Sequence, residues 1–550
     1  MALKYWFEFT DVKTIVHRVE IYKDDFVGDS TQIYGSCSLE YSETKDTLEP
    51  VRGSGLKIDL EANSALTFYD LYSEEERTFS VVYKRDNQIL FNGWLSPEGI
   101  YESLVSDKWV ISLDCTDGLG FLKNLSYVED ATGLPFVGKQ SLLEIVVNCL
   151  KRTKTPQNIL TSIDVYYDGL TQTLDPFANV YFNANRFVKD DNNTIMNCDE
   201  VLKSVLEPFG AIITSYKGEW LIYKPNSLFD SSSKVLFAYD SLGVALGTPS
   251  RTIDFAFDLG SQIDSYYPHH VNGNQQKTIK SSIGAYRINY KYGFVKSFFT
   301  NLYLQNVAGV VDEWTVDDGT FLTFPASNNG LILESSDTLD LATVIIYSNS
   351  FFNLKANDII TFTTVIKTIF LSGNIQPKCI FKIRLNNYFL NFDGNWTTNN
   401  EGFFVTSSSQ ADVLYTLNSN PLPEDGNIYI EIYRPYQIED VNNNVLIKEC
   451  NIKPSENNLK GENHTFQREL KPSSKIKDTK EVFNGDNESD TYVGAIYKAD
   501  ETTTTNLWTR FGASETKPLL QIMGEERMKM YSKPLQVYKG DVYGYFNYLS

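Results

Sequence analysis

The chain has 550 residues, more than one hydrophobic core usually serves, so three or four domains are expected. Its formal net charge is −21, from 49 basic and 70 acidic residues, which disfavours binding to the phosphate backbone of nucleic acids. Aromatic residues make up 14% of the chain and favour a mainly β protein built of many short strands, with few helices.

Residues 1–125 are predicted to form the first domain, a small β-barrel or sandwich. Its strands are expected at Tyr5–Phe9, Thr14–Tyr22, Ser54–Leu60, Thr67–Leu71, Phe79–Lys84, Ile89–Leu95 and Lys108–Cys115. The turn residues 85–88 join Phe79–Lys84 and Ile89–Leu95 in a hairpin. Pro97-Glu98-Gly99 is expected to break the strand pattern after Leu95.

Residues 126–225 are predicted to be an α+β connecting domain with two helices and a hairpin. One helix is expected at 140–150, where apolar residues recur on one face. The second begins at Asn197, which precedes Glu200 at the spacing of a capping box, and it is expected to end at Pro208 and Gly210. Ala211–Tyr216 and Glu219–Lys224, joined by Lys217-Gly218, are typical of a tight hairpin.

Two segments of this first half resemble phage tail hub proteins. The first lies in the predicted barrel and is carried by Arg85-Asp86-Asn87, Phe91-Asn92-Gly93-Trp94-Leu95, Pro97-Glu98 and Asp117-Gly118-Leu119-Gly120. The second is the helix and hairpin of residues 197–224, in the order that the family shows. The resemblance implies a baseplate hub that continues the tail tube, with two similar barrels per chain arranged as a trimer.

A second hub-like barrel is predicted for residues 226–300 together with 456–550, interrupted by a different β domain. Ala285–Tyr292 alternates as a strand, and a helix is expected to open at Pro518. Residues 301–455 contain about eight strands at short spacing, which favours a jelly-roll sandwich. The strands are expected at Gly330–Glu334, Leu341–Ser348, Asp358–Val365, Lys378–Leu385, Tyr388–Phe392, Val413–Leu417, Asn427–Tyr433 and Val445–Ile452.

This block resembles family-four-like carbohydrate-binding modules. The resemblance is carried by Asn306 to Trp314, Leu354–Ile359, Trp396, Pro423–Tyr433 and Ile447–Pro454. It implies a sandwich that can bind glycan, with Trp396 stacking on a sugar face and Tyr388 and Asn386 as aromatic and polar neighbours. A buried core tryptophan is the competing interpretation, favoured for Trp396 and more strongly for Trp314.

The sequence indicates no catalytic site, metal site or cofactor. The four histidines, His17, His269, His270 and His464, are interpreted as loop residues without a role rather than zinc ligands. Six widely spaced cysteines indicate buried free thiols. No nucleophile elbow, HExxH or phosphate-binding loop occurs, and the many carboxylates are interpreted as surface groups. No apolar stretch is long enough for a membrane span, and no signal peptide is recognised.

Together these features predict a structural protein of a phage or prophage tail, located in the virion tail and assembled in the host cytoplasm. Its expected partners are two further copies of itself, the tail tube, the distal tail protein, a tail spike or fibre, and a host surface glycan. The alternatives are a cell-surface glycan-binding protein and a tail-borne glycoside hydrolase. We expect no enzymatic activity.

Overall fold

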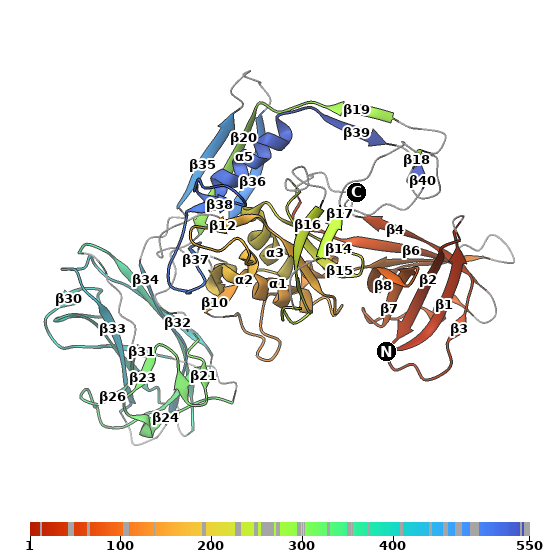
Figure 1. Cartoon of the computed structure of the whole chain (residues 1–550). Helices are drawn as coiled ribbons and strands as arrows, with labels where there is room; N and C mark the ends of the chain where they lie inside the picture. Colours follow the sequence, from red (N-terminus) through yellow and green to blue (C-terminus); the bar gives the residue numbers. More distant parts are fainter. Residues whose placement is uncertain are drawn as a thin grey trace.

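The structure is a computed structural model that describes residues 1–11, 14–41, 49–62, 66–102, 109–136, 138–189, 194–225, 233–246, 251–254, 269–270, 276–293, 299, 301, 303–326, 330–348, 354, 356–371, 375–407, 411–438, 443–454, 460–467, 476–483, 494–539 and 542–543. The protein is mainly β, with several sheets and few helices. Figure 1 shows a helix-containing middle unit in the centre, with the N-terminal sheet on one side and the sandwich on the other. The boundaries of the four predicted domains stay a prediction.

The N-terminal unit is one eight-stranded sheet in the order β3-β1-β2-β7-β8-β9-β6-β4. Its strands are β1 Ala2–Thr10, β2 Val16–Lys23, β3 Thr31–Gln32, β4 Gly35–Tyr41, β6 Ser54–Glu61, β7 Phe79–Arg85, β8 Gln88–Glu102 and β9 Val110–Thr116, and the short helix η1 is Phe68–Asp70. The predicted hairpin and the alternation in β9 are confirmed, since Ile111 and Leu113 are buried in the core of this sheet.

Three expectations for this unit are corrected. The segment expected as a strand at Thr67–Leu71 contains the short helix η1 instead. The sheet is not a closed barrel in the described residues, because its outermost strands are β3 and β4 and β3 has only two residues to offer a partner. Pro97-Glu98-Gly99 does not end the strand either. β8 continues to Glu102 through a register shift between Leu95 and Ile100, and such a bulge accommodates a proline that cannot donate a hydrogen bond.

The middle unit has a six-stranded sheet in the order β17-β16-β11-β15-β14-β5, covered by helices. The strands are β5 Val51–Arg52, β11 Ile159–Ser162, β14 Ile212–Tyr216, β15 Glu219–Tyr223, β16 Ser233–Tyr239 and β17 Arg251–Asp254. The helices are η2 Leu119–Asn124, α1 Leu142–Lys151, α2 Pro176–Asn179, η3 Ala184–Phe187, α3 Cys198–Leu206 and η4 Glu207–Phe209.

Local sequence explains the helix starts of this unit. The Ser141 side chain accepts a hydrogen bond from the Glu144 amide at the start of α1. At α3, Asn197 accepts from the Glu200 amide at 2.9 Å and Glu200 accepts from the Asn197 amide at 3.0 Å. The predicted capping box is therefore confirmed, and Gly210 ends the helical segment with a left-handed backbone, φ 62°.

Segments from the end of the chain complete the middle unit. A three-stranded sheet joins β10 Lys139–Ser141 and β13 Tyr181–Asn183 to β37 Ile496–Tyr497, and β12 Val165–Tyr167 pairs with β38 Trp508–Arg510. Trp508 and Leu519 lie in the same buried cluster as α1 and α3. The helix expected at Pro518 is confirmed as α5, Leu519–Tyr531.

The sandwich consists of two sheets around a core of its own. The first has the order β23-β26-β33-β28-β29-β30, with β31 also on β28, and its strands are β23 Trp314–Val316, β26 Val344–Ser348, β28 Lys378–Leu385, β29 Tyr388–Leu390, β30 Trp396–Thr397, β31 Phe403–Thr406 and β33 Ile428–Tyr436. The second has the order β24-β25-β34-β27-β32, and its strands are β24 Leu322–Thr323, β25 Leu331–Glu334, β27 Ile360–Ile369, β32 Val413–Asn418 and β34 Asn444–Pro454. β21 Asn306–Val307, β22 Val310–Val311 and η5 Gly319–Phe321 precede them. All eight expected strands are present.

Strands on the two sides of the sandwich pair with each other. β20 Ala285–Gly293 lies between β35 Lys460–Gln467 and β36 Ile476–Phe483. β18 His269–His270 pairs with β40 Val542–Tyr543, and β19 Gln276–Lys280 pairs with β39 Leu535–Lys539. The predicted second barrel is not closed in the described residues, because β16 and β17 extend the middle sheet and the remaining strands form one three-stranded sheet and these two ribbons.

Candidate functional site

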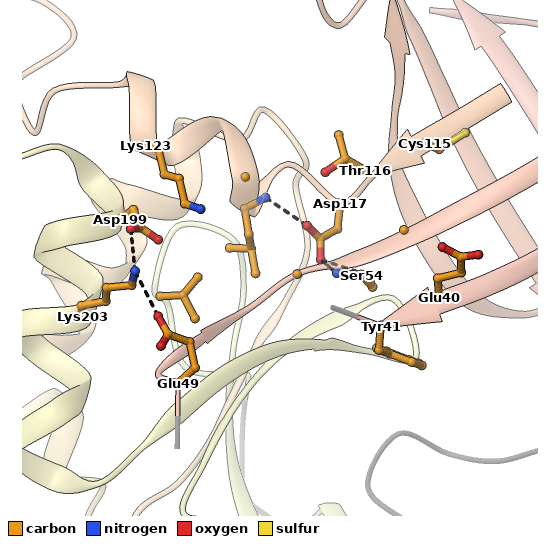
Figure 2. Close-up of a pocket in the computed structure, with 15 residues that line it drawn as sticks. Glu40, Tyr41, Glu49, Ser54, Cys115, Thr116, Asp117, Lys123, Asp199 and Lys203 are labelled. Carbon is orange, nitrogen blue, oxygen red and sulfur yellow. Dashed lines mark hydrogen bonds and ion pairs between the residues drawn. The ribbon is translucent and has the colours of Figure 1, made fainter. Parts of the chain in front are cut away.

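The residues of the first hub-like segment lie where the N-terminal sheet meets the middle unit. Asp117 is fully buried, and its carboxylate accepts hydrogen bonds from the Ser54 amide at 2.6 Å, the Ser54 hydroxyl at 3.0 Å and the Leu119 amide at 3.0 Å (Figure 2). It therefore joins the start of β6 to the start of η2. Burial raises the pKa of Asp117 to about 6, although the hydrogen bonds from Ser54 and Leu119 lower it in part.

Gly93 and Trp94 form the next part of this junction. A Cβ atom at Gly93 would lie 2.1 Å from the Thr116 carbonyl oxygen, so only glycine permits this approach of β8 to β9. The buried Trp94 indole donates to the Thr153 carbonyl and to the Thr155 hydroxyl, both at 2.9 Å, in the loop after α1. The glycine of the motif is thus explained by the close approach of two strands within the N-terminal sheet, and the tryptophan by its contact with the middle unit.

A cavity of about 900 Å³ lies at the same junction (Figure 2). Inside it Lys203 forms ion pairs with Glu49 at 3.1 Å and with Asp199 at 3.0 Å. Burial alone would lower the pKa of Lys203, but the hydrogen bonds to these carboxylates raise it above its ordinary value. The single positive charge of Lys203 is balanced by Glu49 and Asp199. These ion pairs join parts of the chain, and they do not indicate a binding site for a charged ligand.

The predicted glycan residues lie at one edge of the sandwich, but they do not form one cluster. Asn386 occupies the turn between β28 and β29 with φ 49°, and its amide donates to the Glu424 carboxylate at 2.8 Å and to the Asp425 carbonyl at 3.2 Å. It holds a neighbouring loop, and that role accounts for its position.

Trp396 and Tyr388 lie on the core side of their strands. Trp396 is opposite the fully buried Leu390, packs against the sandwich core, and donates its indole hydrogen to the Asn420 carbonyl at 3.1 Å. Tyr388, two residues before Leu390, is on the same side and half-buried. The packing interpretation of Trp396 agrees with this geometry. The buried Trp314 stacks on Phe299 at 5.1 Å and is a core residue, as predicted.

A different surface of the sandwich carries accessible aromatic residues that the sequence analysis missed. Tyr429 of β33, Arg384 of β28 and Phe389 of β29 are direct cross-strand partners on the face opposite the core. The Arg384 guanidinium lies 4.9 Å from the Tyr429 ring centre and 3.9 Å from Glu431. We name Tyr347, Arg384, Phe389, Tyr429 and Glu431 the outer-sheet row. The alternation of Tyr429 and Glu431 with buried isoleucines in β33 was the available signal.

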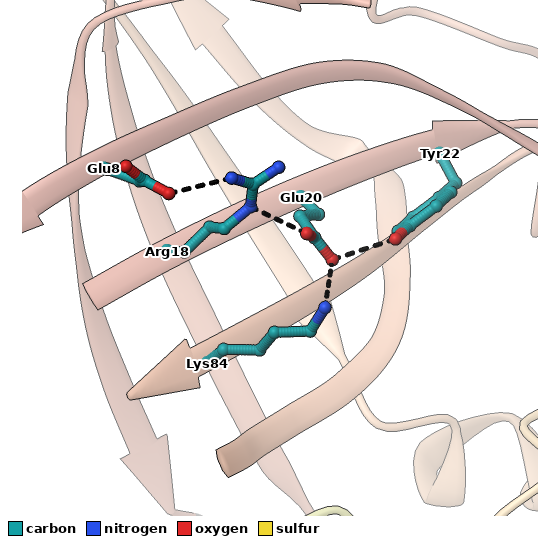
Figure 3. A network of polar contacts seen from close by, with 5 residues as sticks. All are labelled: Glu8, Arg18, Glu20, Tyr22 and Lys84. Carbon is teal, nitrogen blue, oxygen red and sulfur yellow. Dashed lines mark hydrogen bonds and ion pairs between the residues drawn. The ribbon is translucent and has the colours of Figure 1, made fainter. Parts of the chain in front are cut away.

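A charged network covers the outer face of the N-terminal sheet (Figure 3). Glu20 accepts hydrogen bonds from Arg18 at 2.7 Å, Lys84 at 2.7 Å and Tyr22 at 2.8 Å, and Arg18 also reaches Glu8 at 2.8 Å. Burial raises the pKa of Glu20, but the hydrogen bonds from Lys84, Tyr22 and Arg18 outweigh it and lower the pKa. Each charged group of this network therefore has an oppositely charged partner on the same strand or a neighbouring one, and the network serves to stabilise the sheet.

The loop interpretation of the histidines is wrong for His269 and His270, which lie in β18, and for His464, which lies in β35. His17 lies in β2, within the strand expected at Thr14–Tyr22. His17 is buried, stacks on Phe9 and bonds to the Tyr83 hydroxyl at 2.7 Å. The six cysteines are free, and five of them are buried. Across the described ranges, no three His, Cys, Asp or Glu side chains are grouped so that they could hold a metal ion.

A search of the helices in the described part of the chain finds none with the length and apolarity needed to cross a membrane.

The sequence matches no protein-family profile and no curated protein. Similar solved structures include a tail protein from Neisseria meningitidis MC58, with 12% identity, a TM-score of 0.29, and coverage of 50% of this chain and 63% of the other. A 43 kDa tail protein of prophage MuSo2 from Shewanella oneidensis has 13% identity, a TM-score of 0.23, and coverage of 38% and 55%. The CBM22-1 xylan-binding domain of Xyn10C from Paenibacillus barcinonensis has 10% identity, a TM-score of 0.21, and coverage of 30% and 96%.

The similar structures therefore include a tail protein, a prophage tail protein and a xylan-binding domain, and the chain spans less than two thirds of either tail protein. At these TM-scores the similarity does not assign a function to this chain.

Proposed function

We propose that this chain is a structural protein of a phage or prophage tail, a hub that continues the tail tube, and that its sandwich contacts host surface glycans during adsorption. The proposal includes a homotrimeric ring in the virion tail, assembled in the host cytoplasm. It also includes contacts with the tail tube, the distal tail protein and a tail spike or fibre. The protein acts as a scaffold and not as an enzyme.

The observation that carries the tail assignment is the shared position of the hub-like motif residues. Gly93, Trp94 and Asp117 all lie at the junction of the N-terminal sheet with the middle unit. The second segment reaches the same junction, since Gly218 of the β14–β15 turn lies against Ile89 of β8. Two separate sequence segments that meet at one junction support a shared architectural origin for the resemblance.

The display of the sandwich supports the glycan contact. The sandwich has its own core and is inserted between β20 and β35. These two strands pair with each other, and their pairing begins at Gly293 and Lys460, the residues nearest the sandwich in sequence. Both connections therefore leave from one end of a two-strand ladder. This arrangement presents the sandwich away from the rest of the chain, as Figure 1 shows.

The outer-sheet row is the surface that we assign to glycan. Its half-buried aromatic rings offer stacking faces for the apolar side of a sugar, and Arg384 and Glu431 offer hydrogen bonds to hydroxyl groups. Trp396, Tyr388 and Asn386 remain the predicted alternative, and Trp396→Ala is the variant that tests them.

The tail assignment is tested on virus particles from the host strain. An antibody against this chain should label one end of the tail in negative-stain images, and the purified protein should form rings with a central hole. Particles labelled elsewhere, or a compact monomer at all concentrations, would contradict the hub.

The glycan assignment is tested with the full-length protein on an array of host glycans. Tyr429→Ala should abolish binding and leave the melting temperature unchanged, because the ring lies on the solvent face. The matched control is Tyr347→Phe, which keeps the ring. Loss of binding in Trp396→Ala with full binding in Tyr429→Ala would move the site to the predicted edge.

A further inference from the structure

The side chains described in the ribbon of β19 and β39 form no core. Its five residue pairs run from Gln276 with Lys539 to Lys280 with Leu535, and all five side chains of β19 are exposed. Ile279 is 70% exposed and Val537 is 43% exposed. A two-stranded ribbon with no buried face is only marginally stable in water. Figure 1 shows the ribbon running out from β20 and α5, clear of the sheets below it.

The same ribbon is basic, in a chain that is strongly acidic. Residues 276–282 and 532–539 contain four lysines and no Asp or Glu, whereas the whole chain has a net charge of −21. No acidic residue occurs between Asp264 and Asp312, or between Glu526 and Asp541. Lys277, Lys280 and Lys533 are exposed. The acidic residues of this chain are therefore excluded from both strands of the ribbon.

A complementary surface lies on the N-terminal sheet. The outer face of β4, β6 and β9 is opposite the buried Leu56, Ile58 and Leu60, and cross-strand register places four carboxylates and one lysine on it. They are Glu40, Asp59, Glu61, Asp114 and Lys57. Tyr101, which pairs with Ser112 on this face, is 57% exposed. We name this surface the acidic face.

We propose that the β19–β39 ribbon of one copy lies against the acidic face of a second copy of this chain. The lysines would meet carboxylates, and Ile279 or Val537 would be covered beside Tyr101. The ribbon and the acidic face are different surfaces, so the contact is heterologous, and its repetition closes a ring when the rotation permits. The inference rests on the self-association in the proposed function and names the two surfaces that produce it.

A second copy fits better than nucleic acid. A nucleic acid would meet the ribbon's lysines, but it would also meet the field of a chain with net charge −21. The carboxylates of the acidic face, in contrast, attract the lysines of the ribbon.

The test is the association of the full-length protein, measured by sedimentation velocity over a range of concentrations and salt. Lys277→Glu/Lys280→Glu/Lys533→Glu should raise the dissociation constant at least about tenfold, since each exposed lysine changes from attraction to repulsion. The matched control carries the same change of charge at exposed lysines elsewhere, Lys123→Glu/Lys151→Glu/Lys154→Glu, and should associate like the natural chain. High salt should raise the dissociation constant of the natural chain and reduce the difference in dissociation constant between it and the ribbon variant.

A charge reversal on both surfaces separates this contact from a loss of folding. Adding Glu40→Lys, Asp59→Lys and Asp114→Lys to the ribbon variant should restore association. Unchanged association in the ribbon variant would overturn the ribbon contact and leave the ring proposal standing. A natural chain that stays monomeric would overturn both. Binding of a fluorescent DNA duplex that the ribbon variant loses, with association unchanged, would overturn the contact and assign the ribbon to nucleic acid.

Discussion

The absence of a side chain at Gly93 allows β8 and β9 to pack closely against each other. Its backbone approaches Thr116 so closely that a Cβ atom would lie 2.1 Å from the carbonyl oxygen, a distance that no side chain tolerates. The neighbouring Trp94 then reaches across to the loop after α1. Gly93 thus permits the close packing of β8 and β9, and Trp94 connects β8 to the middle unit.

Gly93→Ala is expected to destabilise the N-terminal sheet by about 1–3 kcal/mol, because β8 must move away from β9 to admit the methyl group. Differential scanning calorimetry should show a lower melting temperature for the transition of this sheet. Gly120→Ala is the control, since nothing lies within 4 Å of the position of its added Cβ atom. Equal melting temperatures for the two variants would contradict the close approach.

Asp117 gives the junction a pH dependence. Burial raises its pKa in the folded protein to about 6, above the ordinary value of 3.8 that applies after unfolding. The folded state therefore binds the proton more tightly, so this carboxyl group stabilises the fold below pH 4 and loses that contribution as the pH rises through 6. A shift of this size corresponds to about 3 kcal/mol in the free energy of unfolding.

The measurement is urea unfolding of the natural chain and of Asp117→Asn between pH 4 and 7. Asparagine does not titrate, so the natural chain's advantage over the variant should shrink as the pH rises across this interval. The difference between the two proteins isolates Asp117 from Asp175, whose pKa burial also raises. An advantage that is constant or grows with pH would contradict the raised pKa.

At the scale of elements, a buried ion cluster links segments from both sides of the sandwich. The Lys224 ammonium, 2% exposed, lies 2.9 Å from Asp164 and 2.9 Å from Glu526 of α5. Glu526 also pairs with Arg510 of β38 at 2.9 Å. These contacts attach α5 and β38 to the end of β15.

Lys224→Met is expected to cost about 3 kcal/mol, because it removes one partner from a buried cluster of charges. Glu526→Leu added to Lys224→Met should cost less than the sum of the single variants, with a coupling above about 1 kcal/mol. The free energies are measured by urea unfolding, followed by circular dichroism.

Lys517→Met is the control for that cycle, since its partner Glu525 is exposed and surface pairs contribute less than about 1 kcal/mol. Additive effects of Lys224→Met and Glu526→Leu would show that the two side chains do not act together.

Elements were predictable where one segment carries its own signal. The alternation in Ile360–Ile369 and the capping box of α3 each lie within a few residues, and both are found in the structure. The partners of strands were not predictable, because an apolar pattern marks a strand but not its neighbour. β5 adds to the middle sheet beside β14, and β38 pairs with β12 across more than 300 residues of sequence.

At the scale of the whole molecule, the sandwich is an insertion whose removal should leave the remainder folded. Gly293 and Lys460 are cross-strand partners in the β20–β35 ladder, so the two cut ends are adjacent. Deleting residues 294–459 and joining the ends by Asn-Gly should form a tight hairpin. We expect a cooperative melt by circular dichroism and the same number of protomers by light scattering as for the intact chain.

For the intact chain the expected mass is near three protomers. An insoluble product from the deletion would show that the sandwich is required for folding. A folded product with a changed number of protomers would place part of the contact between copies on the sandwich.

The candidate glycan surface shows why sequence alone did not identify it. Trp396 stands out in the sequence as an aromatic residue among polar ones, but its register with Leu390 places it on the core side. Tyr347, Phe389 and Tyr429 come from three strands, β26, β29 and β33, that share one face only after the sheet has formed. Their face is decided by strand register, and a shift of one residue would reverse it.

The sequence by itself determined the mainly β composition, the individual strands and helices, and the presence of a sandwich between two dissimilar segments, because these depend on short-range periodicity and capping. Only the tertiary structure decided that the N-terminal sheet stays open in the described residues, that the end of the chain completes the middle unit, and that the lysines of the ribbon and the carboxylates of the acidic face form two different surfaces. These features depend on pairings between distant segments and on the position of charge in space, and neither is contained in the order of residues along a single element.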